Sequence, residues 1–174
     1  MAQFLSLLVL AVVMVFPAWA VSEQPYDEYE DSPTVYMEGC GAFPAVRLVI
    51  DDRETEARAF IRDGRTFLPA RETLERLGGR VLWVGDQNAF YAQFPAEGRT
   101  VRVTVGSPII NIYRYNKSTD YGAGRQVQTL KLNTEPFRCE GRVFVPVRAA
   151  AEAAGGKIHY DKTANTVYAY SPKK

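Results

Sequence analysis

Few side chains of this chain could carry catalytic chemistry, and they do not lie together in the sequence. His159 is the only histidine among 174 residues. A three-histidine metal site or a histidine-dependent catalytic triad therefore cannot form within one chain. Alternation puts His159 on the opposite strand face from Ile158 and Tyr160, as is typical of an exposed strand residue. We expect no metal and no cofactor.

Carboxylates are the remaining candidates for catalysis. Asp51, Asp52 and Asp86 could act in pairs as general acid and base in a small hydrolase. Each of them, however, lies where a turn uses aspartate for hydrogen bonds to the backbone. We predict that the protein is not an enzyme and keep a carboxylate-dependent hydrolase as an alternative.

The N-terminus has the pattern of an export signal. An apolar run at 4–16 is followed by Ala18-Trp19-Ala20, a small-x-small cleavage motif. We predict a signal peptide at 1–20, no integral membrane segment after cleavage, and a secreted or extracytoplasmic protein. No Lys or Arg precedes the apolar run, so an uncleaved membrane anchor is the alternative.

Cys40 and Cys139 are the only cysteines. Export would place them in an oxidising compartment, where an even number of cysteines favours a disulfide. The bond would close a loop of about 100 residues. Two free thiols are the alternative.

Residues 21–38 form an acidic segment. No Lys or Arg occurs between Glu23 and Glu38, although the chain has 21 Lys and Arg against 20 Asp and Glu. Acidic segments with few aliphatic residues are typical of disordered linkers. The chain after Gly39 is therefore basic, which suits an anionic partner or contact with the linker itself. An even scatter of arginines over a solvated surface explains the same composition.

The strongest candidate for a binding surface is the segment 113–127. Tyrosines supply flat rings with a hydroxyl, and arginine and lysine supply charge, which suits sugars, anionic polymers or another protein. Stacking on nucleic acid uses similar residues, but no nucleic-acid motif accompanies them and we expect none. The alternative is an extended hairpin whose tyrosines cover its own sheet. The candidate ligand-binding residues are Tyr113, Arg114, Tyr115, Lys117, Tyr121 and Arg125.

An internal repeat predicts the elements that position these residues. Residues 64–95 return without a gap as residues 141–172, so each copy reads as one supersecondary unit. No cysteine, histidine or serine is shared, which indicates a scaffold. The matched positions include Pro69, Arg71, Gly78, Gly79, Pro146, Arg148, Gly155 and Gly156.

Each copy predicts a strand, a short helix and a hairpin. The proline of each copy suits the first turn of a helix, and the paired glycines suit its C-terminal end. Leu74 and Leu77 form the apolar stripe of the first helix, with Ala151 and Ala154 at the matched positions of the second. Alternating residues about a polar turn then predict a hairpin. The fold class is α+β: two β-α-β-β units, at about 46–95 and 100–172, with mainly antiparallel sheets. Together with an insertion at 113–127 they make up a domain at 39–174.

Arg71 and Arg148 precede Glu75 and Glu152 by one helical turn. Arginine before glutamate is the less favourable order for such a pair. We therefore expect both arginines to hydrogen-bond the neighbouring sheet, with an anion-binding pair as the alternative.

The runs GRTFLPAR…LGGRVLW and GRVFVPVR…AGGKIHYD resemble the paired repeats of the copper amine oxidase N-terminal-like domain, or stalk domain, of secreted bacterial proteins. The resemblance covers about 46–170, with Ala70 and Val147 where the family usually has leucine. It implies a non-catalytic binding or structural module of the cell envelope, engaging cell-wall polymer or a surface protein. The alternative is a secreted inhibitor or accessory subunit of a partner enzyme.

Overall fold

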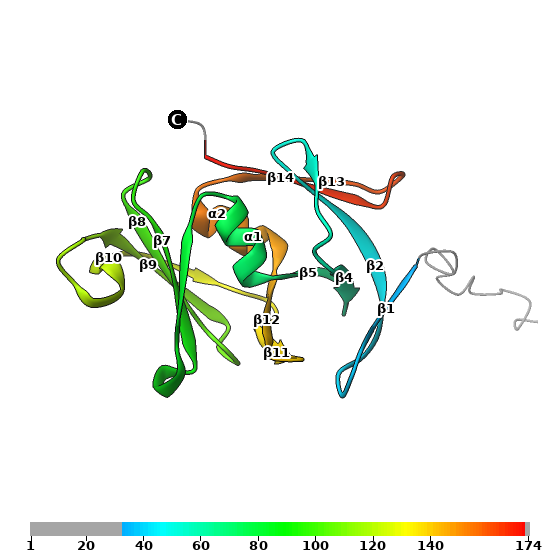
Figure 1. Cartoon of the computed structure of the whole chain (residues 1–174), viewed down its shortest axis with the longest axis horizontal. Coiled ribbons are helices and arrows are strands. Elements are labelled where there is room, and N and C mark those ends of the chain that lie inside the picture. The colour runs from blue at the N-terminus through cyan, green and yellow to red at the C-terminus, as the bar shows by residue number, and fades with distance from the viewer. Residues whose placement is uncertain (1–32, 173–174) are drawn as a thin grey trace, which may run out of the picture. The chain divides into compact units, whose positions relative to one another are not determined.

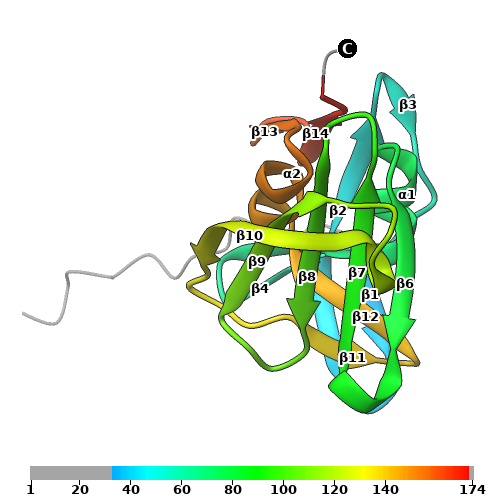
Figure 2. The ribbon, with the colours of Figure 1, turned by 90° about the vertical axis from the view of Figure 1, so that its left-hand side faces the viewer.

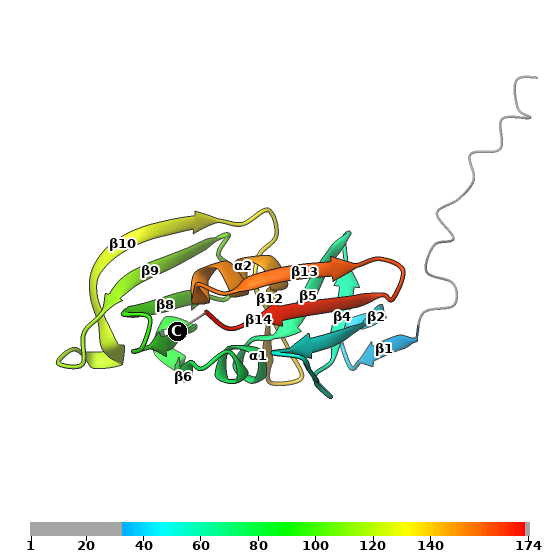
Figure 3. The same ribbon diagram turned by 90° about the horizontal axis from the view of Figure 1, so that it is seen from above.

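Two β-sheets and two short helices make up residues 33–172, the part of the chain that the computed structural model describes (Figure 1). The helices lie between the two sheets in the views of Figures 1 and 3. Strands and helices thus combine as expected for the α+β class. The predicted signal peptide and most of the predicted linker lie outside the described residues.

The large sheet runs in the order β11-β12-β5-β4-β2-β14-β13, and β1 and β3 also pair with β2. Its pairs are antiparallel except for β14, which runs parallel to β2. The prediction of mainly antiparallel pairing is confirmed. The strands of this sheet are β1 (Thr34–Met37), β2 (Gly41–Ile50), β3 (Arg53–Glu54), β4 (Ala59–Arg62), β5 (Arg65–Pro69), β11 (Phe137–Cys139), β12 (Arg142–Pro146), β13 (Lys157–Asp161) and β14 (Thr166–Tyr170).

The small sheet is an antiparallel meander in the order β10-β9-β8-β7-β6. Figure 2 looks onto it, with the helices behind. Its strands are β6 (Arg80–Val84), β7 (Ala89–Phe94), β8 (Arg99–Thr104), β9 (Ile109–Tyr115) and β10 (Ala123–Lys131), with short 3-10 turns at η2 (Gly85–Gln87) and η3 (Asp120–Gly122).

The helices are α1 (Ala70–Arg76) and α2 (Val147–Ala154), and each begins directly after a proline, Pro69 or Pro146, at the N-cap position. The predicted stripes are buried: Leu74 and Leu77 are each 1% exposed. In the second helix Ala151 is 2% and Ala154 0% exposed. The small alanine side chains let α2 pack closely on its neighbours.

The paired glycines end the helices by two different physical means. Gly155 has φ 83°, a left-handed conformation that suits glycine. Gly79 is required by close approach, since a Cβ there would lie 2.7 Å from the ring of Phe94. A Cβ on Gly156 would meet the carbonyl oxygen of Tyr170 in the same way.

The element orders β5-α1-β6-β7 and β12-α2-β13-β14 match, but their hairpins enter different sheets. Strands β5 and β12 pair with each other, so that Phe67 lies opposite Pro146 and Phe144 opposite Pro69. From this shared pair, β6 and β7 continue into the small sheet, whereas β13 and β14 join the large one.

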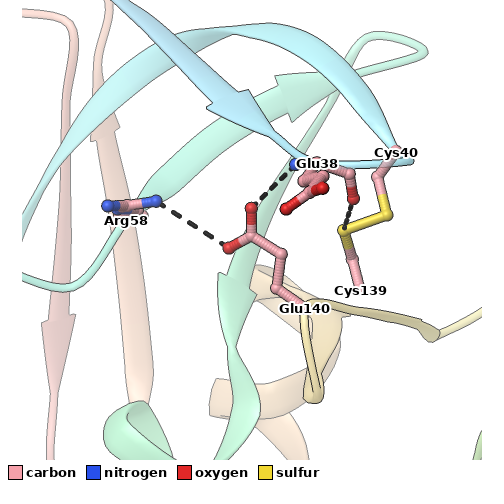
Figure 4. The surroundings of a disulfide bond; sticks show 5 residues. All are labelled: Glu38, Cys40, Arg58, Cys139 and Glu140. Atoms are coloured by element: carbon pink, nitrogen blue, oxygen red, sulfur yellow. Dashed lines mark hydrogen bonds and ion pairs between the residues drawn. A yellow bond between two sulfur atoms is a disulfide. The ribbon is translucent and has the colours of Figure 1, made fainter.

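A cluster of phenylalanines packs beside a disulfide at one end of the large sheet. Phe60 and Phe67 are 0% exposed, and their ring centroids lie 6.0 Å apart. Cys40 and Cys139 form the predicted disulfide, and Cys139 is 3% exposed. Figure 4 shows its surroundings, where the Glu140 carboxylate accepts a hydrogen bond of 2.8 Å from the Glu38 amide.

The C-terminal boundary of the predicted disordered linker, residue 38, lies too far along the chain. Residues 34–37 are the strand β1, antiparallel to β2, rather than part of a disordered segment at 21–38. Val35 and Met37 alternate inward, and Met37 packs 3% exposed in the phenylalanine cluster. This burial offsets the entropy of ordering the strand.

Candidate functional site

The two faces of the small sheet differ in chemistry. One face packs on the helices and the core with apolar side chains, among them Val81, Phe90 and Ile112. The other face carries polar and aromatic side chains, because successive residues of a strand point to opposite faces. We call this second face the hairpin face. By register it comprises Arg80, Leu82, Tyr91, Gln93, Thr100, Arg102, Asn111, Tyr113, Tyr115, Gln126 and Thr129, with Tyr121 added from η3.

The end of the β9–β10 hairpin is folded onto this face. The Tyr121 ring stacks on Tyr91, with centroids 4.8 Å apart and an interplanar angle of 17°. The hydroxyl of Thr100 donates a buried hydrogen bond of 2.7 Å to the carbonyl of Gly122. Gly122 has φ 69°, and a Cβ there would lie 2.9 Å from both Gln93 and the Tyr115 ring. The tyrosines are therefore held in place.

Tyr91 lies at the centre of the hairpin face and is 7% exposed. Its hydroxyl donates a hydrogen bond of 2.9 Å to Gln87 Oε1. Burial raises the pKa of Tyr91, while the positive charge of Arg102 opposes the rise. The Arg102 guanidinium carbon lies 5.9 Å from the centroid of the same ring. Tyr91 is thus neutral at physiological pH, and its ring supports that of Tyr121.

The structure brings together some of the six candidate residues and separates others. Tyr113 and Tyr115 share the hairpin face with Tyr121. Arg114 lies opposite Arg99 in the register and alternates to the other face. Lys117 and Arg125 are exposed near the hairpin end. Segment 113–127 is therefore a strand pair joined by a short turn, the alternative that the sequence left open.

Sequence reasoning missed the hairpin-face residues outside that segment. Tyr91 and Gln93 alternate with the apolar residues Phe90 and Ala92, and this alternation was the available signal. This alternation indicates that the strand has a second, polar face. It does not indicate which neighbouring strands extend that face.

A second candidate site, which we call the arginine groove, lies between the start of α1, strand β6 and the turn from β11 to β12. Its volume is about 340 Å³, within the range of small ligand sites. It is lined by Pro69, Ala70, Arg71, Glu72, Val81, Trp83, Phe90, Arg138, Gly141, Arg142 and Val143.

Positive charge dominates the arginine groove. The guanidinium carbon of Arg138 lies 5.3 Å from the centroid of the half-buried Trp83 ring. Arg142 Nε lies 3.9 Å from Glu72 Oε1, the only pairing of a groove carboxylate with a groove arginine among the described residues. Arg71 adds a third guanidinium, so arginines outnumber carboxylates in the lining.

The expected hydrogen bonds from Arg71 and Arg148 to the sheet are absent. Both side chains are exposed, and neither has a hydrogen bond or ion pair with another residue in 33–172. The expectation was wrong because the buried side of α1 is formed by Ala70, Thr73 and Leu74. Arg71 is thereby turned away from the sheet and toward the groove.

The residues considered for catalysis are dispersed. Asp51 is in the turn after β2, where its carboxylate accepts a hydrogen bond of 2.8 Å from the Ser171 amide. Asp86 lies in η2, and Figure 2 shows this turn at the opposite end of the molecule from β3. His159 is exposed, with its ring 6.2 Å from that of Tyr168. Within residues 33–172, no three His, Cys, Asp or Glu side chains gather to hold a metal ion.

No helix in the described part of the chain is long and apolar enough to span a membrane.

Comparison with known proteins identifies the family. The chain matches the family model of the copper amine oxidase N-terminal domain over residues 49–169. No curated protein and no solved structure matches it. The matched residues include both helices, the hairpin face and the arginine groove, and the domain of this family is non-catalytic in itself. The chain therefore belongs to the copper amine oxidase N-terminal domain family.

Proposed function

We propose that the protein is an exported, non-catalytic binding module of the cell envelope that engages cell-wall polymer through the hairpin face. One observation carries the proposal: the face of the small sheet that no helix covers combines stacked tyrosines with amide and hydroxyl side chains. Two arginines, Arg80 and Arg102, lie on this face by register.

This combination suits a sugar polymer. A sugar ring offers a flat C–H face, which packs on an aromatic ring, and hydroxyls, which need both donors and acceptors. Tyr121 is 37% exposed and presents such a ring. Asn111, Gln126 and Thr129 lie beside the tyrosines and supply amide and hydroxyl groups that both donate and accept.

The scaffold in this proposal consists of two copies of one β-α-β-β unit. Support comes from the matched order of elements and from the pairing of β5 with β12 at matched positions. The shared pair fixes the two units to each other. The hairpin of the first unit extends into the small sheet that presents the tyrosines.

Retention on insoluble bacterial peptidoglycan tests the proposal. The variant Tyr113→Ala/Tyr121→Ala removes two rings from the hairpin face and should lower affinity for the polymer about thirtyfold, since stacking contacts are worth about 1 kcal/mol each. Tyr170→Ala is the matched control, because Tyr170 is also 37% exposed but lies in β14. Its retention should equal that of the unaltered protein.

Folding is checked by the thermal midpoint, which should move by only a few degrees for either variant. If the folded double variant is retained as well as the unaltered protein, the hairpin face does not bind the polymer. If Tyr170→Ala lowers retention on peptidoglycan as much as the double variant does, the hairpin face is not the specific binding surface.

The arginine groove favours a second candidate function, that of an accessory subunit bound to a partner protein. The hairpin face and the groove use different side chains. The two functions can therefore coexist in one chain and be tested separately.

A further inference from the structure

We propose that the arginine groove binds an extended acidic peptide segment of a partner protein, in which a carboxylate side chain stands next to an aromatic or aliphatic one. This site is separate from the hairpin face and does not depend on polymer binding.

The guanidinium groups of the groove determine the charge of its ligand. Three arginines face one carboxylate, and Arg71 has no hydrogen bond or ion pair with another described residue. A planar guanidinium presents two parallel N–H groups that match the two oxygens of a carboxylate. Arg138 is oriented by its stacking on Trp83, which lowers the entropy lost when a carboxylate binds. The groove is thus prepared for an anion.

The apolar residues of the lining favour a ligand that carries an apolar group as well as a negative charge. Val81, Phe90 and Val143 line the groove together with Trp83. Burying an apolar side chain against them is favourable in proportion to the area removed from water. A volume of about 340 Å³ has room for one or two side chains. An acidic residue beside an aromatic or aliphatic residue satisfies both parts of the lining.

The lining also distinguishes a peptide from a sugar. None of the described residues that line the groove is Asn, Gln, Ser, Thr or Tyr. The hydroxyl donors of a sugar would find Glu72 as the single side-chain acceptor, and Arg138 already covers the Trp83 ring on which a sugar could stack. A peptide instead brings carboxylate and carbonyl acceptors to the arginine donors.

The strands beside the groove suit an extended chain. Strand β6 is the edge of the small sheet and β11 is the edge of the large sheet. Both contribute to the lining, through Trp83 and Arg138 respectively. Edge strands carry unpaired backbone groups, which an extended peptide can use.

Fluorescence anisotropy with a labelled ten-residue peptide of alternating Glu and Tyr tests this inference on the full chain. The variant Arg71→Gln/Arg138→Gln should weaken binding by about tenfold or more. The charge-matched control is Arg148→Gln/Arg65→Gln. Arg148 occupies in α2 the position that Arg71 occupies in α1, and neither control residue lines the groove. The control should bind within about twofold of the unaltered protein.

Two further peptides separate the parts of the ligand. A Gln–Tyr peptide lacks the charge and a Glu–Ser peptide lacks the apolar side chain, and both should bind at least about tenfold more weakly than the Glu–Tyr peptide. Equal binding of the Glu–Ser peptide would reduce the site to general attraction by a basic surface and overturn the proposal.

Tryptophan emission provides a second measurement that does not depend on the arginine variants. Trp19 and Trp83 are the two tryptophans of the chain. Comparison with Trp83→Phe identifies the part of the fluorescence emission that comes from Trp83 in the groove. Binding of the Glu–Tyr peptide should change the Trp83 contribution. If the arginine variant and its control lose affinity equally, or the peptide binds without changing that contribution, the peptide does not occupy the groove.

Discussion

The hairpin face and the arginine groove use opposite sides of the same two strands, β6 and β7. Tyr91 points to the hairpin face, whereas its neighbour Phe90 lines the groove together with Trp83. One face offers neutral amides, hydroxyls and stacked tyrosines, and the other offers arginines over an apolar floor. Alternation along a single hairpin therefore gives the two proposed binding surfaces different chemistry.

The two surfaces are also held by different parts of the molecule. The hairpin face depends on local packing of Gly122 and Tyr121 against the small sheet. The groove depends on β11, a strand of three residues that ends at the disulfide cysteine Cys139. Changes can thus be chosen that affect one surface and leave the other intact.

The largest expected effect comes from removing the disulfide. In Cys40→Ala/Cys139→Ala the free energy of unfolding should fall by about 3–4 kcal/mol, because the bond constrains the unfolded chain. The folded protein should bind the Glu–Tyr peptide more weakly, since Arg138 precedes Cys139 in β11. Denaturant unfolding and anisotropy measure the two effects. Peptidoglycan retention should not change below the unfolding transition, and a parallel loss of retention would show that the surfaces are not independent.

A smaller effect is expected at the hairpin end. Gly122→Ala places a Cβ against Gln93 and Tyr115 at a positive φ, and should cost about 1–3 kcal/mol while displacing the Tyr121 ring. Gly106→Ala is the control, since Gly106 has φ 74° but no atom within 4 Å of a Cβ. Only Gly122→Ala should lose peptidoglycan retention, and neither variant should lose peptide binding. If Gly122→Ala and Gly106→Ala lose peptidoglycan retention equally, the loss comes from backbone strain and not from displacement of the Tyr121 ring.

The pH dependence of stability should report on Tyr91. Because burial raises its pKa, the folded protein holds this proton more tightly than the unfolded chain. The stabilisation is fully present below the ordinary tyrosine pKa of about 10 and is lost as the pH rises through the higher folded value. Denaturant midpoints measured from pH 8 upward should therefore fall more steeply for the unaltered protein than for Tyr91→Phe. If the denaturant midpoints of the two proteins fall equally with rising pH, burial does not raise the pKa of Tyr91.

The smallest expected effect concerns the one carboxylate of the groove. Glu72→Gln removes the partner of Arg142 and should strengthen binding of the Glu–Tyr peptide about two- to threefold, as expected for a partly exposed charge. Glu75→Gln is the control on the same helix, outside the groove lining. Weaker binding in Glu72→Gln would mean that Glu72 positions Arg142 for the ligand.

Local signals in the sequence predicted the helices, their glycine ends, the hairpins and the cysteine pair. Each of these follows from neighbouring residues or from simple pairing of the only two cysteines. The parallel pairing of β14 with β2 could not be predicted in this way, because it joins segments more than 100 residues apart. Nor could the groove, since Arg71, Trp83 and Arg138 come from three separate segments.

Competition between the two ligands tests the account most directly. The protein is first bound to insoluble peptidoglycan and then treated with saturating Glu–Tyr peptide, and the protein that remains bound is measured. We predict that the retained fraction of protein does not change and that labelled peptide is held with the protein on the polymer. Release of the protein by the Glu–Tyr peptide, but not by the Glu–Ser peptide, would contradict this prediction by showing that one surface binds both ligands.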